Sequence, residues 1–429
     1  MKLLFIYPRF SRHAEVHPEL KQWVPMNEYL GSPSLGIATI AAVTPRDVEL
    51  EFRDDRLSPA DHPTDADAVC FSFFTPAATR ALELAKYFRA LGKPLIAGGI
   101  FPTMMPEVCA GAFDAVVLGE GEPVWAQVLA DLRAGALKPR YQANGAQALD
   151  GLPLPRVDLY LEREAGHFQP DDYPVQLSRG CPLTCQACVL PVSMTRSLRN
   201  FTLDHVVGQL EQLAARGKRA CLTEDTSWFP GAAVKTLKAL FERIVARGAP
   251  ATISYVGISM PMILATPPAT LQLAKRAGVD MFYLVGGFDP VTRGAFTGTN
   301  PRQLERAYEA ISRCHDAGIE PYTSFLIGND EDDPGSVDRM LEFAQKSGIT
   351  KAEFAIFTPY PGTPAWKRLA AEERIIDRTW AHYNDTTCVF LPKNFTPQSL
   401  TDAYLRLWRE FYATRDLSHL DTAQRTIQF

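Results

Sequence analysis

The chain has 429 residues, of which 46% are hydrophobic and 22% are charged, and its formal net charge is −5. This length predicts two or three domains rather than a single core. The mild negative charge excludes a general attraction to nucleic acid or anionic lipid, so neither a nucleic-acid partner nor a membrane span is expected. The opening MKLLFIYPRF reaches polar residues too early for a secretory signal, which favours a cytoplasmic location.

Residues 1–135 alternate between strand and helix patterns. Strand patterns such as KLLFIY, ADAVCFSFF and FDAVVLGEGE are separated by helical stretches such as TRALELAKYFRALG. This alternation predicts an α/β, doubly wound, Rossmann-like domain whose ligand binds at the carboxyl ends of parallel strands. The irregular, partly proline-rich segment 136–173 is predicted to be a linker.

A second alternation runs through residues 174–377. Its predicted strands are 175–178, 219–223, 251–257, 281–285, 321–327 and 352–357, and its predicted helices are 204–216, 232–247, 269–277, 302–317 and 335–347. Six such units predict a partial (βα)6 barrel. The uncharged stretch 249–274 contains four prolines and is therefore expected to be a strand, a loop and a helix start. Residues 378–429 are predicted to form a helical extension over one mouth or side of the barrel.

Three cysteines, Cys181, Cys185 and Cys188, follow the first predicted barrel strand. Three interpretations compete: a zinc site, a disulfide with a spare thiol, and a [4Fe–4S] cluster with three thiolate ligands and one free iron. The other five cysteines are scattered singly, as buried free thiols are, and this favours a reducing compartment.

The CxxxCxxC spacing, in a loop after the first strand of such a barrel, resembles the radical SAM superfamily. The resemblance implies that the three cysteines hold a [4Fe–4S] cluster whose open iron chelates S-adenosylmethionine. Transfer of one electron then cleaves a C–S bond and releases a 5′-deoxyadenosyl radical. A flavodoxin or ferredoxin is the implied electron donor.

Other segments resemble the S-adenosylmethionine contacts of this superfamily. They are CLTEDTS and VGGFD after the second and fourth barrel strands, SFLIGNDE at the end of the fifth, and FTPYPGTP after the sixth. The residues implied to contact S-adenosylmethionine are Glu224, Asp225, Thr226, Gly286, Gly287, Asp289, Gly328, Glu331 and Phe357. Two positions depart from the pattern: Ala187 stands where an aromatic residue is common, and Phe288 where a glutamate is common. These departures imply altered placement of S-adenosylmethionine and leave open which bond breaks. Taken singly, each segment also fits an ordinary barrel loop.

The resemblance extends upstream, because residues 67–125 look like the cobalamin-binding domain of the B12-dependent radical SAM subfamily. The implied cobalamin contacts are Ser72, Thr75, Gly98, Gly99, Gly119 and Glu120. Glycines at strand ends leave room for a flat macrocycle or a phosphate-bearing tail. No Asp-x-His-x-x-Gly pattern supplies a lower ligand, as is common in that subfamily. A domain that no longer holds cobalamin is the alternative.

The implied function is an enzyme: a cobalamin-dependent methyltransferase acting on an unactivated carbon of a small or apolar biosynthetic substrate. Radical chemistry without cobalamin (cyclisation, coupling or transfer of a fragment of S-adenosylmethionine) and a non-catalytic iron–sulfur or corrinoid-binding module remain alternatives. Tyr255, Tyr322 and Tyr360, near predicted strand ends, are the candidate substrate contacts or hydrogen donors.

Overall fold

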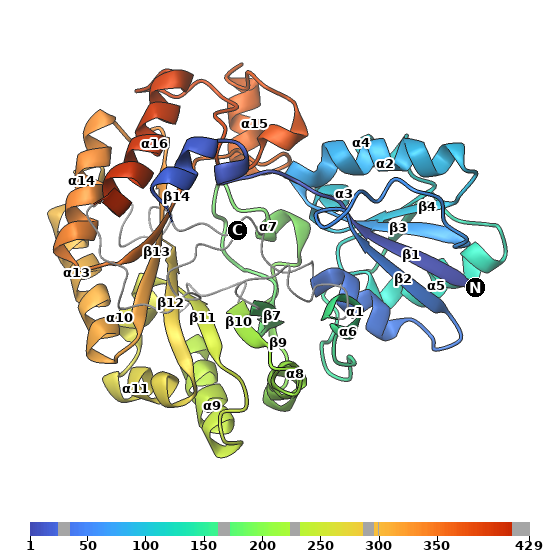
Figure 1. Ribbon diagram of the computed structural model, residues 1–429, viewed down its shortest axis with the longest axis horizontal. Coiled ribbons are helices and arrows are strands. Elements are labelled where there is room, and N and C mark those ends of the chain that lie inside the picture. Colours follow the sequence, from blue (N-terminus) through green and yellow to red (C-terminus); the bar gives the residue numbers. More distant parts are fainter. Residues whose placement is uncertain (25–34, 162–171, 224–231, 286–295, 299, 414–429) are drawn as a thin grey trace.

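The computed structural model describes residues 1–24, 35–161, 172–223, 232–285, 296–298 and 300–413. Two parallel sheets, each with its own helices, form two units that lie side by side (Figure 1). The predicted α/β architecture, a Rossmann-like domain followed by a partial barrel and a helical extension, is confirmed.

The first sheet has the strand order β2-β1-β3-β4-β5-β6, and all its pairings are parallel. Its strands are β1 (Lys2–Tyr7), β2 (Glu49–Asp54), β3 (Ala68–Ser72), β4 (Leu95–Gly98), β5 (Ala115–Leu118) and β6 (Arg140–Gln142). The order reverses between β1 and β3, which is where doubly wound sheets bind ligands. β6 lies within the predicted linker and pairs with β5, so the first sheet continues past residue 135.

Helices cover both faces of this sheet (Figure 1). They are α1 (Leu35–Val43), α2 (Ala78–Ala90), α3 (Ile100–Met104), α4 (Pro106–Ala110) and α5 (Glu122–Arg133), followed by α6 (Asp158–Leu161). Because the central strands are buried on both sides, their sequences are almost continuously apolar rather than alternating, and every residue of β5 is buried.

The second sheet has the order β14-β13-β12-β11-β10-β7 and is also parallel throughout. Its strands are β7 (Asp172–Gln176), β10 (Arg219–Thr223), β11 (Ile253–Ile258), β12 (Val279–Val285), β13 (Glu320–Ile327) and β14 (Lys351–Ile356). All six predicted barrel strands are present, with ends displaced by at most three residues. The ribbon of β8 (Ser178–Arg179) and β9 (Arg199–Asn200) stands apart from this sheet.

The helices of the second unit confirm the predicted alternation. They are α7 (Leu190–Ser193), α8 (Leu203–Ala214), α9 (Ala232–Ala246), α10 (Met260–Ala265), α11 (Pro268–Arg276), α13 (Pro301–Asp316), α14 (Pro334–Lys346), α15 (Pro364–Ala371) and α16 (Pro397–Ala413). The stretch 249–274 forms β11, α10 and the start of α11, so the expected loop contains a short helix. α16 covers β14 and α14 as part of the predicted extension.

The segment after β1 leaves the first domain and lies against the barrel (Figure 1). It contains two short 3-10 helices, η1 (His13–Glu15) and η2 (Pro18–Gln22), and η2 packs on α16. His13 is fully buried against Tyr404 and Trp408 of α16. The barrel is therefore covered by residues from both ends of the described chain.

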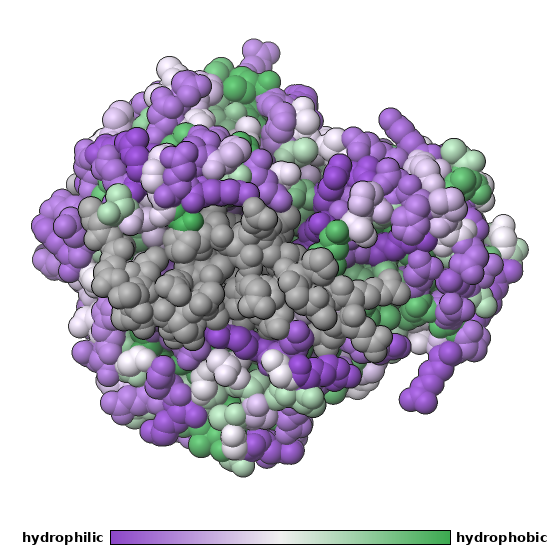
Figure 2. All heavy atoms as spheres, in the orientation of Figure 1, coloured by the Kyte–Doolittle hydropathy of each residue, from purple (hydrophilic) through white to green (hydrophobic). Residues whose placement is uncertain are grey.

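Figure 2 shows mainly hydrophilic side chains on one face of the molecule, with hydrophobic ones gathered where the first domain approaches the barrel. Among the described helices, none has the length and apolar character that a membrane crossing requires.

Replacing Trp408 tests how firmly α16 is attached. Its side chain is fully buried, and its ring packs edge-on against Phe354 of β14 with the centroids 5.4 Å apart. Trp408→Ala should lower the free energy of unfolding by about 3–5 kcal/mol because it leaves a large cavity. Chemical denaturation would measure the loss. The exposed substitution Asp402→Ala on the same helix should change stability by less than about 0.5 kcal/mol, and equal losses would contradict this account.

Candidate active site

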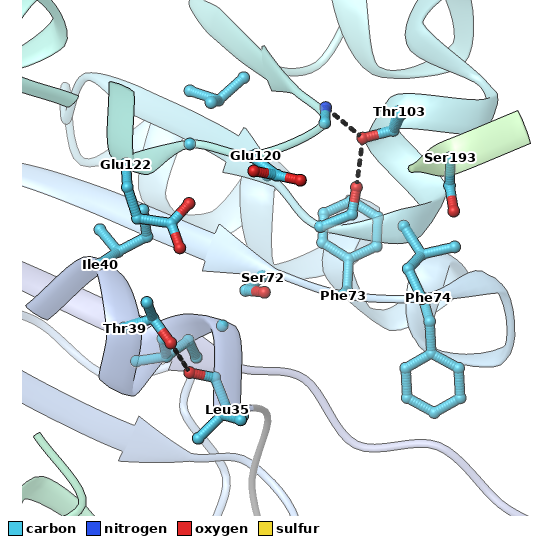
Figure 3. A pocket seen from close by; sticks show the side chains of 18 of the residues that line it. Leu35, Thr39, Ile40, Ser72, Phe73, Phe74, Thr103, Glu120, Glu122 and Ser193 are labelled. Carbon is cyan, nitrogen blue, oxygen red and sulfur yellow. Dashed lines mark hydrogen bonds between the residues drawn. The ribbon is translucent and has the colours of Figure 1, made fainter. Parts of the chain in front are cut away.

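A cavity of about 440 Å³ lies where the carboxyl ends of the two sheets meet (Figure 3). On the first-domain side, the last residues of β1, β3 and β4 and the turn after β5 line it. On the barrel side, Gln176 and Thr223, the last residues of β7 and β10, line it. Because parallel sheets bind ligands at their carboxyl ends, both units present their ligand-binding edges to one space.

Glycine backbone forms part of the cavity wall. Gly99 has a φ of +100°, and a Cβ atom there would lie only 2.8 Å from the carbonyl oxygen of Phe73. The Thr103 hydroxyl on α3 donates to the Gly99 carbonyl oxygen (2.8 Å) and accepts from the Gly119 amide (2.9 Å) (Figure 3). These contacts hold two strand ends in a fixed position with their backbone facing the cavity.

Apolar side chains make up most of the remaining wall. Leu35 and Ile40 of α1 lie opposite Phe73 and Phe74, which follow β3 (Figure 3). A Cβ atom on Gly121 would lie 2.9 Å from the Ile40 side chain, so the turn after β5 packs directly on α1. The cavity therefore suits a ligand with a large apolar surface.

Most of the residues predicted to contact cobalamin lie at this cavity, although the contacts themselves stay predictions. Five of the six predicted cobalamin contacts line the cavity, namely Ser72, Gly98, Gly99, Gly119 and Glu120. Thr75 is buried in η3 (Thr75–Ala77), away from the lining. Thr103 was not predicted, although a hydroxyl one helical turn after a glycine pair was an available signal.

The acidic turn after β5 is paired with arginines of the second unit. Arg179 donates to Glu122 (Nη1 to Oε1, 2.7 Å), and Arg199 donates through both terminal nitrogens to Glu120. The four side chains are between 7% and 13% exposed. The predicted cobalamin contact Glu120 thus lines the cavity while its carboxylate neutralises a buried guanidinium.

The loop with the three cysteines begins directly after β8. Gly180 has a φ of +87°, and a Cβ atom on it would lie 2.8 Å from the carbonyl oxygen of Thr195. The Cys181 amide donates to that same oxygen (3.3 Å), so the loop folds back on itself. Cys181 is buried, whereas Cys185 and Cys188 are half-buried.

This loop contacts both neighbouring elements. α7, which follows the cysteines, packs against α3 of the first domain, and Ser193 and Met194 line the cavity. The Ala365 amide, directly after the FTPYPGTP segment, donates to the carbonyl oxygen of Gln186 (2.9 Å). The cysteine loop therefore lies beside the cavity and beside the segment predicted to pass the adenine.

None of the described cysteines is joined in a disulfide. Burial raises the pKa of the Cys185 thiol, and the nearby Cys181 adds to the rise. Within the described ranges, no three His, Cys, Asp or Glu side chains converge as a preformed metal site. Three thiols without a fourth cysteine in the loop nevertheless match the donor set of a cluster with one open iron.

The other predicted S-adenosylmethionine contacts have mixed outcomes. Glu224, Asp225, Thr226, Gly286, Gly287 and Asp289, and Phe288 beside them, lie outside the described residues. Gly328 has a φ of +107° and lies against Leu400 of α16. Glu331 is exposed, and Phe357 is 7% exposed and packs edge-on against Phe390. The structure thus accounts for Gly328 and Phe357 through packing, and their predicted contacts remain predictions.

Tyrosines gather on the inner side of the barrel sheet. Tyr283 and Tyr322, paired in neighbouring strands, both donate to Oε2 of Glu353 on β14 (3.2 and 3.3 Å). The ring of Tyr255 lies 5.8 Å from that of Tyr283. Of the three predicted tyrosines, Tyr255 and Tyr322 therefore lie together, and the hydroxyl of Tyr322 is fixed by the carboxylate of Glu353.

The segment after β1 supplies the positive charge for this carboxylate. Arg12 contacts both Glu353 (3.4 Å) and Asp385 (3.0 Å), and the hydroxyl of the third predicted tyrosine, Tyr360, donates to Asp385 (2.6 Å). Burial would raise the pKa of Glu353, but the adjacent His13 and the charge of Arg12 outweigh it and lower that pKa. The carboxylate is thus held ionised.

Sequence reasoning missed Arg12, His13, Tyr283, Glu353 and Asp385. One signal was available: Glu353 is a lone acidic residue inside the apolar strand pattern AEFAIF, which indicates a buried charge that needs a partner. That the partner comes from residue 12 could not be read from any local pattern.

The fold and site together define a Rossmann-like domain joined to a three-cysteine partial barrel, the arrangement of cobalamin-dependent radical SAM enzymes. Comparisons confirm this predicted resemblance. The chain is 24% identical to the bacteriochlorophyllide d C-12(1)-methyltransferase of Chlorobaculum tepidum over 89% of this chain and 83% of that protein. It is 23% identical to the hopanoid C-2 methylase of Rhodopseudomonas palustris over 99% and 82%, respectively.

A solved structure shares the whole fold. The radical S-adenosylmethionine methyltransferase TsrM from Kitasatospora setae, with tryptophan substrate and an S-adenosylmethionine analogue bound, superposes with a TM-score of 0.68. The superposition covers 100% of this chain and 91% of TsrM at 14% identity. A second TsrM structure, with cobalamin and a [4Fe–4S] cluster bound, gives a TM-score of 0.66. No family model matches the chain.

Replacing His13 tests the buried charge network. Its Nδ1 lies 2.8 Å from the Tyr404 hydroxyl, its Nε2 lies 3.5 Å from Glu353, and burial lowers its pKa to about 4. The unfolded chain therefore binds more protons between about pH 6.5 and 4, and folding stability falls as the pH is lowered through that window. We expect wild type to lose up to about 3 kcal/mol more than His13→Asn across it.

Urea denaturation at several pH values measures this difference. Asparagine tolerates the positive φ of 41° at this position and does not titrate. His62→Asn, at an exposed histidine, should follow the wild-type pH profile. Identical pH profiles for wild type and His13→Asn would contradict the assignment.

Proposed function

We propose that this chain is a cobalamin-dependent radical SAM methyltransferase that transfers a methyl group to an unactivated carbon of a small or apolar substrate. One observation carries the proposal: the carboxyl edges of both sheets line a single cavity, and the three-cysteine loop lies directly beside it. The names of the relatives, which are methyltransferases and a methylase, support the same reaction class.

Each part of the site has a distinct task. Cys181, Cys185 and Cys188 would hold the cluster, and Gly99 and Gly119 would let a corrin ring or its phosphate-bearing tail approach the backbone. When bound, the cluster and S-adenosylmethionine would supply the radical, and methylcobalamin the methyl group. The apolar walls would exclude water from this chemistry.

The inner tyrosines support an apolar substrate with a ring system. Two relatives of this chain are named as a bacteriochlorophyllide methyltransferase and a hopanoid methylase, and the structure of TsrM contains tryptophan as substrate. In this chain, Glu353 engages the hydroxyls of Tyr283 and Tyr322, so these tyrosines would offer mainly their ring surfaces. Tyr255, half-buried beside them, would contact the substrate.

A flavodoxin- or ferredoxin-type donor would supply the electron in the cytoplasm. The described cysteines form no disulfide with one another, which supports a reducing compartment. The departures at Ala187 and Phe288 leave the cleaved bond to be determined from the products.

Removing one cluster ligand tests the assignment of the cysteines. Cys185→Ala should reduce the iron content of anaerobically reconstituted protein from about four atoms per chain to a small fraction. Formation of 5′-deoxyadenosine, or of another cleavage product of S-adenosylmethionine, should fall to background. Iron analysis and chromatography measure both. Cys388→Ala, at a half-buried thiol outside the loop, is the matched control and should retain both the iron content and the cleavage of S-adenosylmethionine. Wild-type protein that binds iron but yields no cleavage product would indicate a binding module.

Replacing Gly99 tests the cavity wall. In Gly99→Ala, the new methyl group would collide with Phe73 and strain a φ of +100°, so we expect hydroxocobalamin to bind at least about tenfold more weakly. Titration followed by the visible corrinoid spectrum measures the affinity. Gly92→Ala is the matched control, because Gly92 also has a positive φ (+70°) but has open space around it. Unchanged affinity in Gly99→Ala would argue against cobalamin at this wall.

A further inference from the structure

Two arginines face each other on the ribbon that closes the cysteine loop. Arg179 of β8 and Arg199 of β9 are register partners, and the ribbon has only two residues in each strand. Like charges directly opposite each other destabilise an antiparallel pair, and so short a ribbon has little stability of its own. The ribbon therefore needs compensation from outside.

The first domain supplies that compensation. Glu120 and Glu122, in the turn after β5, bind Arg199 and Arg179 respectively. Arg179 also lies 3.9 Å from Glu120, so the four side chains form one alternating cluster. Gln176 accepts a hydrogen bond from Arg179 Nε (2.9 Å), and the guanidinium lies over the Phe201 ring, which fixes its plane. We call Arg179, Arg199, Glu120 and Glu122 the interdomain clamp.

The clamp acts at the base of the cysteine loop. Arg179 is followed directly by Gly180 and Cys181. Towards the other end of the loop, Ser193 and Met194 line the cavity, five residues before Arg199. The same turn that carries Glu120 also carries Gly119, whose amide is held by Thr103 in the cavity wall. One set of ion pairs thus joins the cavity wall to both ends of the loop.

We propose that the interdomain clamp is a positioning element that fixes the cysteine loop relative to the cavity of the first domain. This inference rests on the proposed function, because a fixed separation matters when a cluster and a corrinoid must address the same substrate. Its four members are positioning residues, since their charged groups bind one another. Buried ion pairs add little net stability, but removing one partner leaves an unpaired buried charge, which is strongly unfavourable. Such pairs are therefore suited to fixing the relative position of two segments.

Hydrogen exchange tests the clamp without any cofactor. In Arg179→Gln, amides of residues 180–198 should exchange at least about tenfold faster than in wild type, while those of β1 and β3 keep their rates. Arg179→Lys keeps the positive charge but loses the planar guanidinium group with its several donors, so it should give an intermediate exchange rate. Glu122→Gln should reproduce the effect from the other side of the interface.

A second buried pair provides the matched control. Arg80 on α2 binds the fully buried Asp55 (2.8 Å) inside the first domain. Arg80→Gln should leave exchange in 180–198 unchanged. Equal exchange in Arg179→Gln and wild type, or an equal increase in Arg80→Gln, would overturn the proposal.

Protein loaded with cluster and corrinoid gives a second readout. The magnetic coupling between the reduced cluster and cob(II)alamin reports the distance between them. In Arg179→Gln it should become weaker or more broadly distributed at unchanged iron and corrinoid content, and Arg179→Lys should partly restore it. A coupling identical to that of wild type would also overturn the proposal. If wild type binds no corrinoid, the proposed function fails, and the exchange measurement still decides whether the clamp holds the loop.

Discussion

Parallel strand pairing is the constraint on which the arrangement of this molecule depends. It gathers the carboxyl ends of all strands of a sheet at one edge, and here two such edges meet. The glycine-rich turns of the first domain and the cysteine loop of the barrel are far apart in sequence. The turns follow strands of the first sheet, and the cysteine loop follows β7 of the second sheet by way of the short strand β8. Their proximity is a result of topology, and side-chain contacts then refine it.

Buried charge is the second organising principle. Burying an ion is unfavourable unless a partner neutralises it, and the carboxylates between the two units obey this rule. Glu353 is matched by Arg12, and Glu122 by Arg179. Each pair joins residues from different units, so these interactions also hold the units in register. The surface ion pairs elsewhere, such as that of Arg133 with Asp47, have no comparable role.

The sequence predicts the periodic parts of this structure well. The strands and helices follow directly from apolar patterning, and the glycines and cysteines after strand ends indicate the cavity and the loop. It does not predict contacts between distant segments. Nothing near Glu120 indicates that its carboxylate binds Arg199, and nothing near His13 indicates burial against Tyr404 and Glu353. Such contacts depend on how the two units dock, which local patterns do not encode.

The placement of Arg12 has a consequence for biosynthesis and for engineering. Arg12 and Asp385 are separated by 373 positions. Arg12 is therefore synthesised long before its two acidic partners, Glu353 and Asp385. Formation of this ion pair is therefore a long-range event with an unfavourable loop-closure entropy. A barrel excised at the domain boundary would expose Glu353 without its cation. A chimaera between relatives would have to inherit residues 12 and 13 from the same parent as β14.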